Sequence, residues 1–355
     1  MPLIIEGRVP TRWAQRSHSR AVVSIDCYVK RAKCIHLGFV NNMPDTALED
    51  TELQFFELLD IASGDVPIFL KLYSLTGVPR TDRGQSHLNQ FYSGLDELWN
   101  DQLDGVILTG TEPRQPDLQQ EPYWSALADV LDWAERNTVS TVLSCLAAHA
   151  GVLHSDGIRR SPLSDKRFGV FTSTRVSAHQ LTRRAPPQMR FPHSRWNEVQ
   201  ENALTSCGYT VLTKSAQAGV DVFVKQKRKS LFVHFQGHPE YGAQTLLKEY
   251  RRDIKRFLRR ERESYPTMPY GYFDATSAKL LAEFQQTVLA NANEAKLVLF
   301  PEAVVAVLQN SWQSSATCIY RNWLQYVLTR KAEASPFKAV SGSYSEVERK
   351  RSAVL

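Results

Sequence analysis

The first half of the chain alternates short apolar runs with longer segments whose apolar positions recur every three or four residues. The apolar runs predict buried strands at 34–41, 66–75, 104–110 and 139–145. The periodic segments predict amphipathic helices at 46–60, 87–99 and 123–137. Because strands and helices alternate, we expect an α/β fold with a doubly wound, mostly parallel sheet.

The pattern changes beyond residue 165. Segments 167–177 and 220–235 alternate apolar and polar residues, which predicts antiparallel pairs on a half-exposed sheet as an extension of the fold. A basic amphipathic helix is predicted at 245–260, and residues 275–330 predict C-terminal helices packed back on the domain. We therefore expect one domain over 34–330, a poorly packed lead-in over 1–33 and a disordered polar tail over 331–355.

Composition narrows the class of protein. The 355 residues are 43% hydrophobic and 23% charged, with a net charge of +6. No arginine-rich stretch is interleaved with aromatic residues, which argues against a nucleic-acid partner. No apolar run approaches the roughly 20 residues of a membrane helix, and the N-terminus does not resemble a signal peptide. The five cysteines are widely spaced without a C-x-x-C pair, so the sequence predicts no disulfide framework, no metal site and a reducing, cytoplasmic location.

Cys145 ends a predicted buried strand, and the small residues of "LAAHAG" follow it as a helix start. This is the strand–turn–helix layout of a nucleophile elbow, in which the helix N-terminus favours the thiolate. A buried cysteine in the same place is also a common core residue. On this stretch alone the core thiol is favoured over the nucleophile.

The string "FVHFQGHPEYG" (232–242) alters that balance. A strand gives way to glycine, and His238 and Glu240 are two residues apart, so in an extended segment their side chains lie on one side. The carboxylate can then orient the imidazole, as the third member of a triad does. With Cys145 upstream, we predict a catalytic set of Cys145, His238 and Glu240.

Two weaker signals accompany this set. "LTGTEPRQP" (108–116) ends a strand in a polar turn, where the N–H of Thr111 can form an oxyanion hole with the N–H of Leu146. "FPHSRWNEV" (191–199) is predicted as a loop that brings His193, Ser194 and Arg195 together. An arginine such as Arg252 can bind a carboxylate through two hydrogen bonds, although an isolated surface arginine is more often a solvated charge.

These strings, in this order, resemble the homoserine O-succinyltransferase family, which is related in fold to class I glutamine amidotransferases. The matching segments are "VNNMP" (40–44), "TELQFFELL" (51–59), "DGVILTG" (104–110), "PYW" (122–124), "SCLAAHAG" (144–151), "DKRFGVF" (165–171), "FPHSRWNEV" (191–199), "GHPEY" (237–241), "EYRRD" (249–253) and "NWLQYV" (322–327).

The resemblance implies acyl transfer from an acyl-CoA co-substrate, succinyl or acetyl, to the side-chain hydroxyl of homoserine, with no bound cofactor. It implies a ping-pong route in which Cys145 carries the acyl group, His238 is the general base and Glu240 orients it. The family's substrate-binding lysine, serine and arginine correspond to Lys166, Ser194 and Arg252. The family also implies a homodimer and small-molecule substrates as the only further partners.

The sequence departs from the family pattern near the site. A lysine pair that usually follows "MP" is replaced by Asp45, Thr46 and Ala47. The aromatic residue and the glutamine that the family has after the cysteine correspond to Leu146 and His149. The position that tunes acyl choice in the family, glycine for succinyl and glutamate for acetyl, aligns with Arg114, whose charge favours a succinyl carboxylate.

Three alternatives stay open at this stage. The same chemistry can act on serine or another hydroxy amino acid, because the segment 45–47 differs from the family. A glutamine amide hydrolase shares the Cys and His-Pro-Glu arrangement, but usually has glycines beside the cysteine, where this chain has Ser144 and Leu146. A catalytically silent binding protein is disfavoured by the intact Cys145, His238 and Glu240.

Overall fold

The computed structural model describes residues 3–17 and 33–334. Its strands are β1 (Leu3–Ile5), β2 (Ile35–Val40), β3 (Ile68–Tyr73), β4 (Gly105–Leu108), β5 (Ser140–Ser144), β6 (Ser161–Arg175), β7 (Gln188–Glu198), β8 (Thr210–Val211), β9 (Thr213–Ser215), β10 (Gly219–Val220), β11 (Val222–Lys227) and β12 (Ser230–Phe235). Its α-helices are α1 (Thr11–Ser17), α2 (Asp45–Ser63), α3 (Asp82–Phe91), α4 (Leu95–Asn100), α5 (Trp124–Asn137), α6 (Leu146–Asp156), α7 (Glu201–Ser206), α8 (Thr245–Leu258), α9 (Ala275–Ala290), α10 (Ala303–Ala306) and α11 (Gln313–Ala334).

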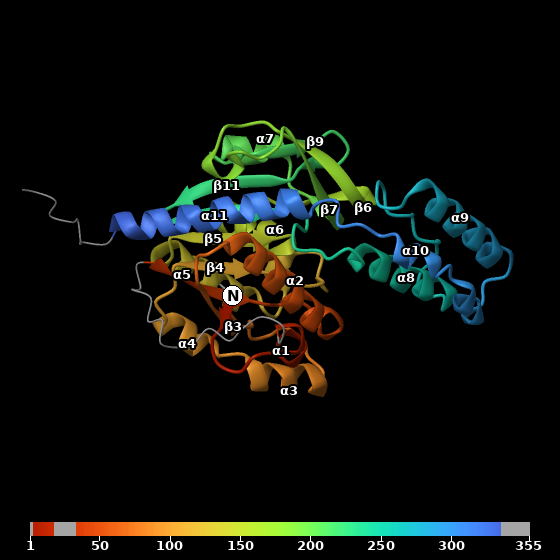
Figure 1. Ribbon diagram of the computed structural model, residues 1–355, viewed down its shortest axis with the longest axis horizontal. Helices are drawn as coiled ribbons and strands as arrows, with labels where there is room; N and C mark the ends of the chain where they lie inside the picture. Colours follow the sequence, from red (N-terminus) through yellow and green to blue (C-terminus); the bar gives the residue numbers. More distant parts are fainter. Residues whose placement is uncertain (1–2, 18–32, 335–355) are drawn as a thin grey trace, which may run out of the picture.

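The main sheet has eight strands in the order β1-β3-β2-β4-β5-β12-β11-β8 (Figure 1). From β1 to β12 each neighbouring pair is parallel, and β11 and β8 add an antiparallel edge. The predicted doubly wound, mostly parallel α/β sheet is therefore confirmed. Because β2, β4, β5 and β12 are neighbours and run the same way, the segments that follow them meet at one edge of the sheet.

The two faces of the sheet are covered by different helices. In β2, Leu37 and Phe39 lie in the core shared with α2 and α11, whereas Val40 lies in the core shared with α5 and α6. This follows from the alternation of side chains along a strand. Since both faces are covered, the central strands are apolar almost throughout, which is why they appear in the sequence as continuous runs.

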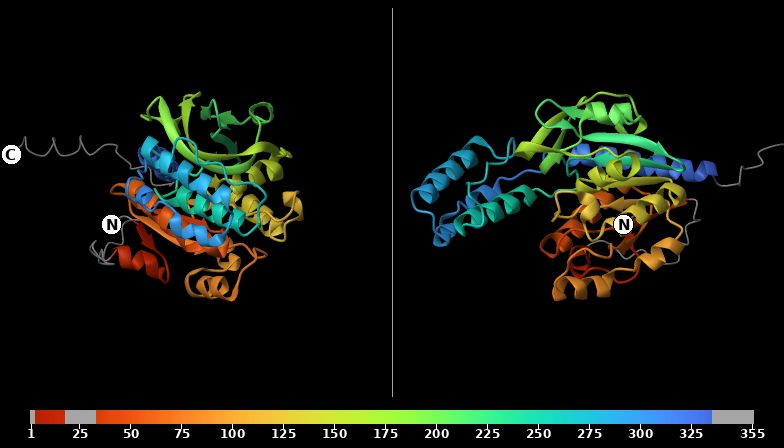
Figure 2. Two further views of the ribbon diagram at one scale, coloured as in Figure 1. Left: turned by 90° about the vertical axis from the view of Figure 1, so that its right-hand side faces the viewer. Right: turned by 180° about the vertical axis from the view of Figure 1, so that it is seen from behind.

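Two additions stand on this framework (Figure 2). A second, antiparallel sheet of four strands has the order β10-β9-β6-β7. The helices α8, α9 and α10 form an extension with its own apolar core, which includes Leu247, Ile254, Phe284 and Trp312. The predicted antiparallel part and C-terminal helices are thus present, but α9 and α10 pack in the extension, whereas α11 packs on the main sheet.

The described residues near both ends of the chain, 3–17 and 331–334, are packed more closely than predicted. Within the expected lead-in over 1–33, β1 pairs with β3 at the sheet edge and Trp13 of α1 is buried, because a three-residue apolar run is enough to add one short strand. The expected tail over 331–355 begins later, since α11 continues to Ala334 and Lys331 donates a hydrogen bond to Asp104. The predictions for residues 18–32 and 335–355 lie outside the described residues.

Three local predictions were wrong. The expected helix at 87–99 is divided into α3 and α4, because Ser93 forms a bridge with Tyr73 beside the sheet. The expected loop at 191–199 is largely strand β7. The segment 220–235 does form an antiparallel pair, but β12 is buried on both faces because it lies between β5 and β11 in the main sheet.

Candidate active site

Cys145 lies in the turn between β5 and α6, as the strand–turn–helix pattern predicts. Its backbone has φ 52° and ψ −109°, a region that residues other than glycine rarely adopt. The turn is held by a hydrogen bond of 2.8 Å from the Cys145 N–H to the Phe235 carbonyl at the end of β12. The side chain is only partly buried, so the thiol stands at the N-terminus of α6 and within reach of a ligand.

The turn after β4 lies directly against this helix start. A Cβ atom added to Gly110 would be 2.6 Å from the Leu146 Cβ and 2.9 Å from the Leu146 nitrogen, so only glycine fits there. Thr111 follows in the same turn, and Gly110, Thr111 and Leu146 line one small cavity. The two segments predicted to supply the oxyanion hole are therefore in contact.

His238 and Glu240 follow β12, the strand beside β5. The His238 Nδ1 lies 2.8 Å from a Glu240 carboxylate oxygen, and both side chains are almost fully buried. Cys145 interacts electrostatically with His238 and favours its charged form. The imidazole of His238 thus interacts with both other residues predicted from sequence, the thiol of Cys145 and the carboxylate of Glu240.

The electrostatic surroundings favour a charged imidazole. Burial alone would lower the pKa of His238, but the Cys145 thiolate and the Glu240 carboxylate raise it well above its ordinary value. The imidazole of His238 is therefore favoured in its protonated form. A protonated imidazole beside a cysteine is the kind of partner that activates a thiol as a nucleophile.

His149, one turn into α6, belongs to the core. Its Nε2 lies 2.9 Å from the Gln236 side-chain oxygen, and the Gln236 amide nitrogen donates to the Val220 carbonyl. Burial, together with the nearby Arg195 charge, lowers the pKa of His149 to about 3. A neutral imidazole that is bound to Gln236 holds the segment before His238 in place and is not an acid–base group.

Lys166 and Ser194 meet at a carboxylate on α8. The Lys166 Nζ lies 3.3 Å from Glu249, and the hydroxyls of Ser194 and Tyr241 also donate to Glu249. Burial alone would raise the pKa of Glu249, but Lys166 and these hydroxyls lower it. Because the Tyr241 ring stacks on His238 with ring centroids 4.2 Å apart, this polar cluster adjoins the catalytic set.

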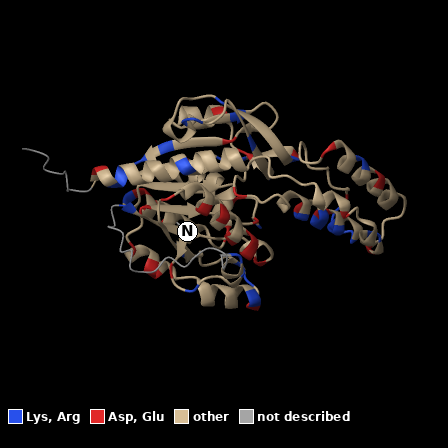
Figure 3. Ribbon diagram, viewed as in Figure 1, with Lys and Arg blue, Asp and Glu red and all other residues tan. Residues whose placement is uncertain are grey.

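Arg252 lies on the same helix, and its side chain is 48% exposed. It pairs with Asp253 at 3.1 Å and lies 3.8 Å from Glu249, so its guanidinium is oriented but accessible. Figure 3 shows that Lys and Arg positions are frequent along α8. Lys166, Ser194 and Arg252, which are far apart in the sequence, are therefore brought together through α8.

Arg114 is placed differently. Its side chain is exposed, while its backbone N–H donates to the buried Glu121 carboxylate, which also accepts the N–H of Gln115 at 2.7 Å. Glu121 thus fixes the turn that runs from Gly110 past Thr111. Arg114 is on the same turn as the predicted oxyanion hole but not in the cluster at Glu249.

A second cluster of buried residues binds the backbone of Gly237 and His238. The Gly237 N–H donates to Asp221 at 3.0 Å, and the His238 N–H donates to the Pro192 carbonyl at 2.8 Å. The His193 Nε2 lies 3.6 Å from Asp221. Burial raises the pKa of Asp221 to about 7 and, with the Arg195 charge, lowers that of His193 well below its ordinary value.

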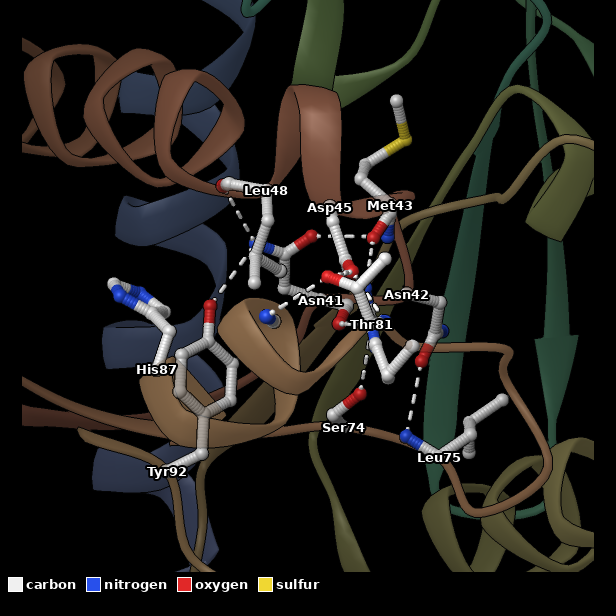
Figure 4. A network of polar contacts seen from close by, with 12 residues as sticks. Asn41, Asn42, Met43, Asp45, Leu48, Ser74, Leu75, Thr81, His87 and Tyr92 are labelled. Atoms are coloured by element: carbon white, nitrogen blue, oxygen red, sulfur yellow. Dashed lines mark hydrogen bonds and ion pairs between the residues drawn. The ribbon is translucent and has the colours of Figure 1, made fainter. Parts of the chain in front are cut away.

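The turn after β2, where the sequence departs from the family, is held by polar contacts (Figure 4). Asn42 donates to the Thr109 carbonyl and accepts from the Leu75 N–H, so it ties the ends of β2, β4 and β3 together. Asp45 accepts the N–H of Thr81 at 2.7 Å and pairs with Arg80. Asp45 is therefore a structural anchor for α3.

The part of the chain that the structure describes offers no cluster of three or more His, Cys, Asp or Glu side chains able to hold a metal ion. Within the same residues, no helix has both the length and the apolar character needed to cross a membrane.

Comparison with protein families gives a match to the homoserine O-succinyltransferase model over residues 2–334. The chain belongs to the homoserine O-succinyltransferase family. A homoserine O-succinyltransferase of Methylorubrum extorquens is 43% identical over 302 residues, which are 85% of this chain and 89% of that protein. One of Methylococcus capsulatus is 36% identical over 347 residues, covering 96% and 97% of the two chains.

Among solved structures, a glutamine amidotransferase from Thermotoga maritima has a TM-score of 0.42 and 12% identity, covering 84% of this chain and 99% of that chain. Another, from Methylobacillus flagellatus, has a TM-score of 0.43 and 11% identity, covering 83% and 95%.

The structure adds residues to the family site that sequence reasoning missed. Glu249 joins Lys166 to Ser194, Tyr241 stacks on His238, and Asp221 binds the Gly237 N–H. Glu249 and Tyr241 stand inside the strings "EYRRD" and "GHPEY", so the signal was present in the segments that carry the family resemblance. Asp221 had no such signal, because a lone aspartate before a strand is usually solvated.

Proposed function

We propose that this protein transfers a succinyl group from succinyl-CoA to the side-chain hydroxyl of L-homoserine through a thioester on Cys145. The observation that carries the proposal is the position of His238 in a member of the homoserine O-succinyltransferase family: its Nδ1 lies 2.8 Å from the Glu240 carboxylate, and it interacts electrostatically with Cys145. Acyl-CoA is a co-substrate and no bound cofactor takes part.

In the first half-reaction the Cys145 thiolate attacks the thioester carbonyl of the donor. The negative charge that develops on the carbonyl oxygen is stabilised by the backbone N–H groups of Leu146 and Thr111. When the tetrahedral intermediate collapses, the bond to the CoA sulfur breaks and the His238 imidazolium gives its proton to that sulfur. Cys145 is left acylated and His238 is left neutral. Glu240 accepts a hydrogen bond from the Nδ1–H of His238 and so keeps the imidazole in place.

In the second half-reaction neutral His238 removes the proton from the acceptor hydroxyl as its oxygen attacks the Cys145 thioester. Collapse forms the ester, breaks the carbon–sulfur bond and restores the thiolate–imidazolium pair. In the first half-reaction His238 gives up its proton, and in the second it takes one from the acceptor hydroxyl. No other acid or base is therefore required. This is a ping-pong mechanism.

We assign the acceptor to the cluster on α8. Arg252 is exposed enough to bind the α-carboxylate of homoserine with two hydrogen bonds, and Asp253 keeps its guanidinium in place. Lys166 and Ser194 contact substrate from the β6 and β7 side, next to Glu249. Arg114, on the turn after β4, favours the succinyl donor over the acetyl donor by its charge.

An activity matrix tests the proposal. Succinyl-CoA and acetyl-CoA are each combined with L-homoserine and L-serine, and the ester product and free CoA are quantified. We expect the highest kcat/KM for succinyl-CoA with homoserine, and a succinyl adduct on the intact protein that is absent in Cys145→Ala. A preference for serine, an adduct that survives Cys145→Ala, or ammonia release from glutamine would each contradict it.

We also propose a cytoplasmic enzyme that acts as a homodimer, with one acyltransferase domain over 34–330. The wide spacing of the five cysteines, without a C-x-x-C pair, is typical of a protein from a reducing compartment. Sedimentation equilibrium tests the dimer, and a single-species monomer mass at micromolar concentration would contradict it.

A further inference from the structure

Tyr241 is the last residue of the tight turn that carries the catalytic base. Its backbone N–H donates to the His238 carbonyl at 3.2 Å, which closes a β-turn with Pro239 and Glu240 at its centre. Proline suits the second position of such a turn because its φ is already fixed. The Tyr241 carbonyl in turn accepts the buried Trp312 indole N–H at 2.7 Å. The backbone of Tyr241 is therefore held at both its N–H and its carbonyl.

This turn places the Tyr241 ring against the imidazole of His238. The two ring centroids are 4.2 Å apart and the ring planes are inclined by 18°, which is a stacked arrangement. The Glu240 carboxylate holds the same imidazole at its Nδ1. One hydrogen bond leaves a ring free to tilt about the line that joins the two bonded atoms, whereas a second ring against its face blocks that tilt. An aromatic face also attracts a cation such as a protonated imidazole. Two contacts of different kinds therefore orient His238.

The other end of the Tyr241 side chain reaches the polar cluster on α8. Its hydroxyl donates to one Glu249 carboxylate oxygen at 2.7 Å. The other Glu249 oxygen accepts from Ser194 and from Lys166. Because Tyr241 is buried and the Glu249 side chain is only 14% exposed, water competes little for these hydrogen bonds. A single phenol thus contacts the base with its face and the proposed acceptor site with its hydroxyl.

We propose that Tyr241 is a positioning residue that holds the general base in a fixed place relative to the acceptor cluster of Lys166, Ser194 and Glu249. Its ring fixes the plane of the His238 imidazole. Its hydroxyl fixes the carboxylate that Lys166 and Ser194 share. The inference rests on the proposed succinyl transfer to homoserine, and it adds one side chain through which the base and the acceptor cluster are joined.

A ping-pong mechanism allows the two contacts of Tyr241 to be tested separately. The kcat/KM for succinyl-CoA reports only the acylation of Cys145, and the kcat/KM for homoserine reports only the transfer from Cys145 to the acceptor. Tyr241→Phe keeps the stacked ring but loses the hydrogen bond to Glu249. It should lower kcat/KM for homoserine by about 10-fold and the value for succinyl-CoA much less. Tyr241→Leu loses both contacts and should lower both values by about 10- to 100-fold, because a misplaced base slows both half-reactions.

Tyr272→Phe is the matched control. The Tyr272 hydroxyl donates to the Ala243 carbonyl, two residues beyond Tyr241. The control therefore removes a tyrosine hydroxyl that is bound to the same loop rather than to Glu249, and both kcat/KM values should stay as in wild type. CD spectra and thermal denaturation establish that each variant is folded.

The outcomes separate this inference from the proposed function. If wild type transfers succinyl to homoserine but Tyr241→Leu keeps both kcat/KM values, the inference is overturned and the function stands. If Tyr241→Phe lowers both values equally, or lowers neither more than Tyr272→Phe does, the hydroxyl does not act through the acceptor cluster and the inference is also overturned. If wild type transfers no succinyl group to homoserine, the proposed function fails and the inference with it. Should Tyr241→Leu not fold, the comparison of Tyr241→Phe with Tyr272→Phe decides.

Discussion

Replacing Glu240 by glutamine separates the charge of the third catalytic residue from its shape. The amide oxygen can still accept from the His238 Nδ1 at a distance near 2.8 Å, but the negative charge beside the imidazolium is lost. A hydrogen bond to a charged group contributes about 1.5–3 kcal/mol, and one pKa unit corresponds to about 1.4 kcal/mol. We therefore expect the pKa of His238 to be lower in Glu240→Gln than in wild type.

The pH profile of kcat/KM reports this change. In the free enzyme the basic limb marks deprotonation of the His238 imidazolium, so this limb should move to lower pH in Glu240→Gln. At pH values on the basic limb, the earlier loss of imidazolium should make kcat/KM lower in Glu240→Gln than in wild type, whereas the two should differ less on the plateau. The profile is measured with saturating homoserine and limiting succinyl-CoA, and CD spectra confirm that the variant is folded.

Ser144→Ala is the matched control. The Ser144 hydroxyl lies 3.4 Å from the same Glu240 oxygen, so its removal perturbs the carboxylate without removing the charge. The control should move the basic limb much less. An unchanged basic limb in Glu240→Gln, or an equal shift in both variants, would refute the assignment of Glu240 as the charge that stabilises the imidazolium.

Three further predictions concern the frame of the site. Gly110→Ala should lower kcat about 100-fold with an unchanged CD spectrum, because its Cβ would lie 2.6 Å from the Leu146 Cβ, whereas Gly94→Ala has free space and should be neutral. Asp221 has a folded-state pKa raised to about 7 by burial, against about 3.9 unfolded, so it binds the extra proton when folded and costs stability as pH rises between these values. The free energy of unfolding of the wild type, measured with urea, should therefore be lower at pH 8 than at pH 4, by roughly 4 kcal/mol at most. This difference should disappear in Asp221→Asn. Trp323→Phe should lower the free energy of unfolding by about 1–3 kcal/mol, since the buried indole N–H donates a hydrogen bond, and an unchanged urea midpoint would contradict this.

The central sheet was predictable because its strands carry a strong local signal. β2, β4 and β5 are short apolar runs between amphipathic helices, and each is buried on both faces. The strand order that brings the segment after β12 to Cys145 was not predicted, because 220–235 was expected in an antiparallel extension whereas β12 lies parallel to β5. β1 was missed because three residues are too few to show a period.

The acceptor cluster was less predictable because its contacts are distant in the sequence. Lys166 and Glu249 are 83 residues apart, and only the packing of α8 against β6 and β7 brings them together. Ser194 was expected in a loop, because buried polar residues such as His193 and Arg195 interrupt the alternation that normally marks a strand. In this region tertiary contacts outweigh local pattern, and no single segment carries the information.

The division between the two sheets has a consequence for how such an enzyme can change. The nucleophile and base follow β5 and β12 of the main sheet, whereas Lys166 and Ser194 stand on β6 and β7 of the second sheet and face α8 of the helical extension. Under the proposed mechanism, the covalent chemistry and the choice of acceptor therefore depend on residues of different sheets. If the mechanism is as proposed, substitutions in the second sheet and α8 should be able to change the hydroxyl substrate without disturbing the strained turn at Cys145.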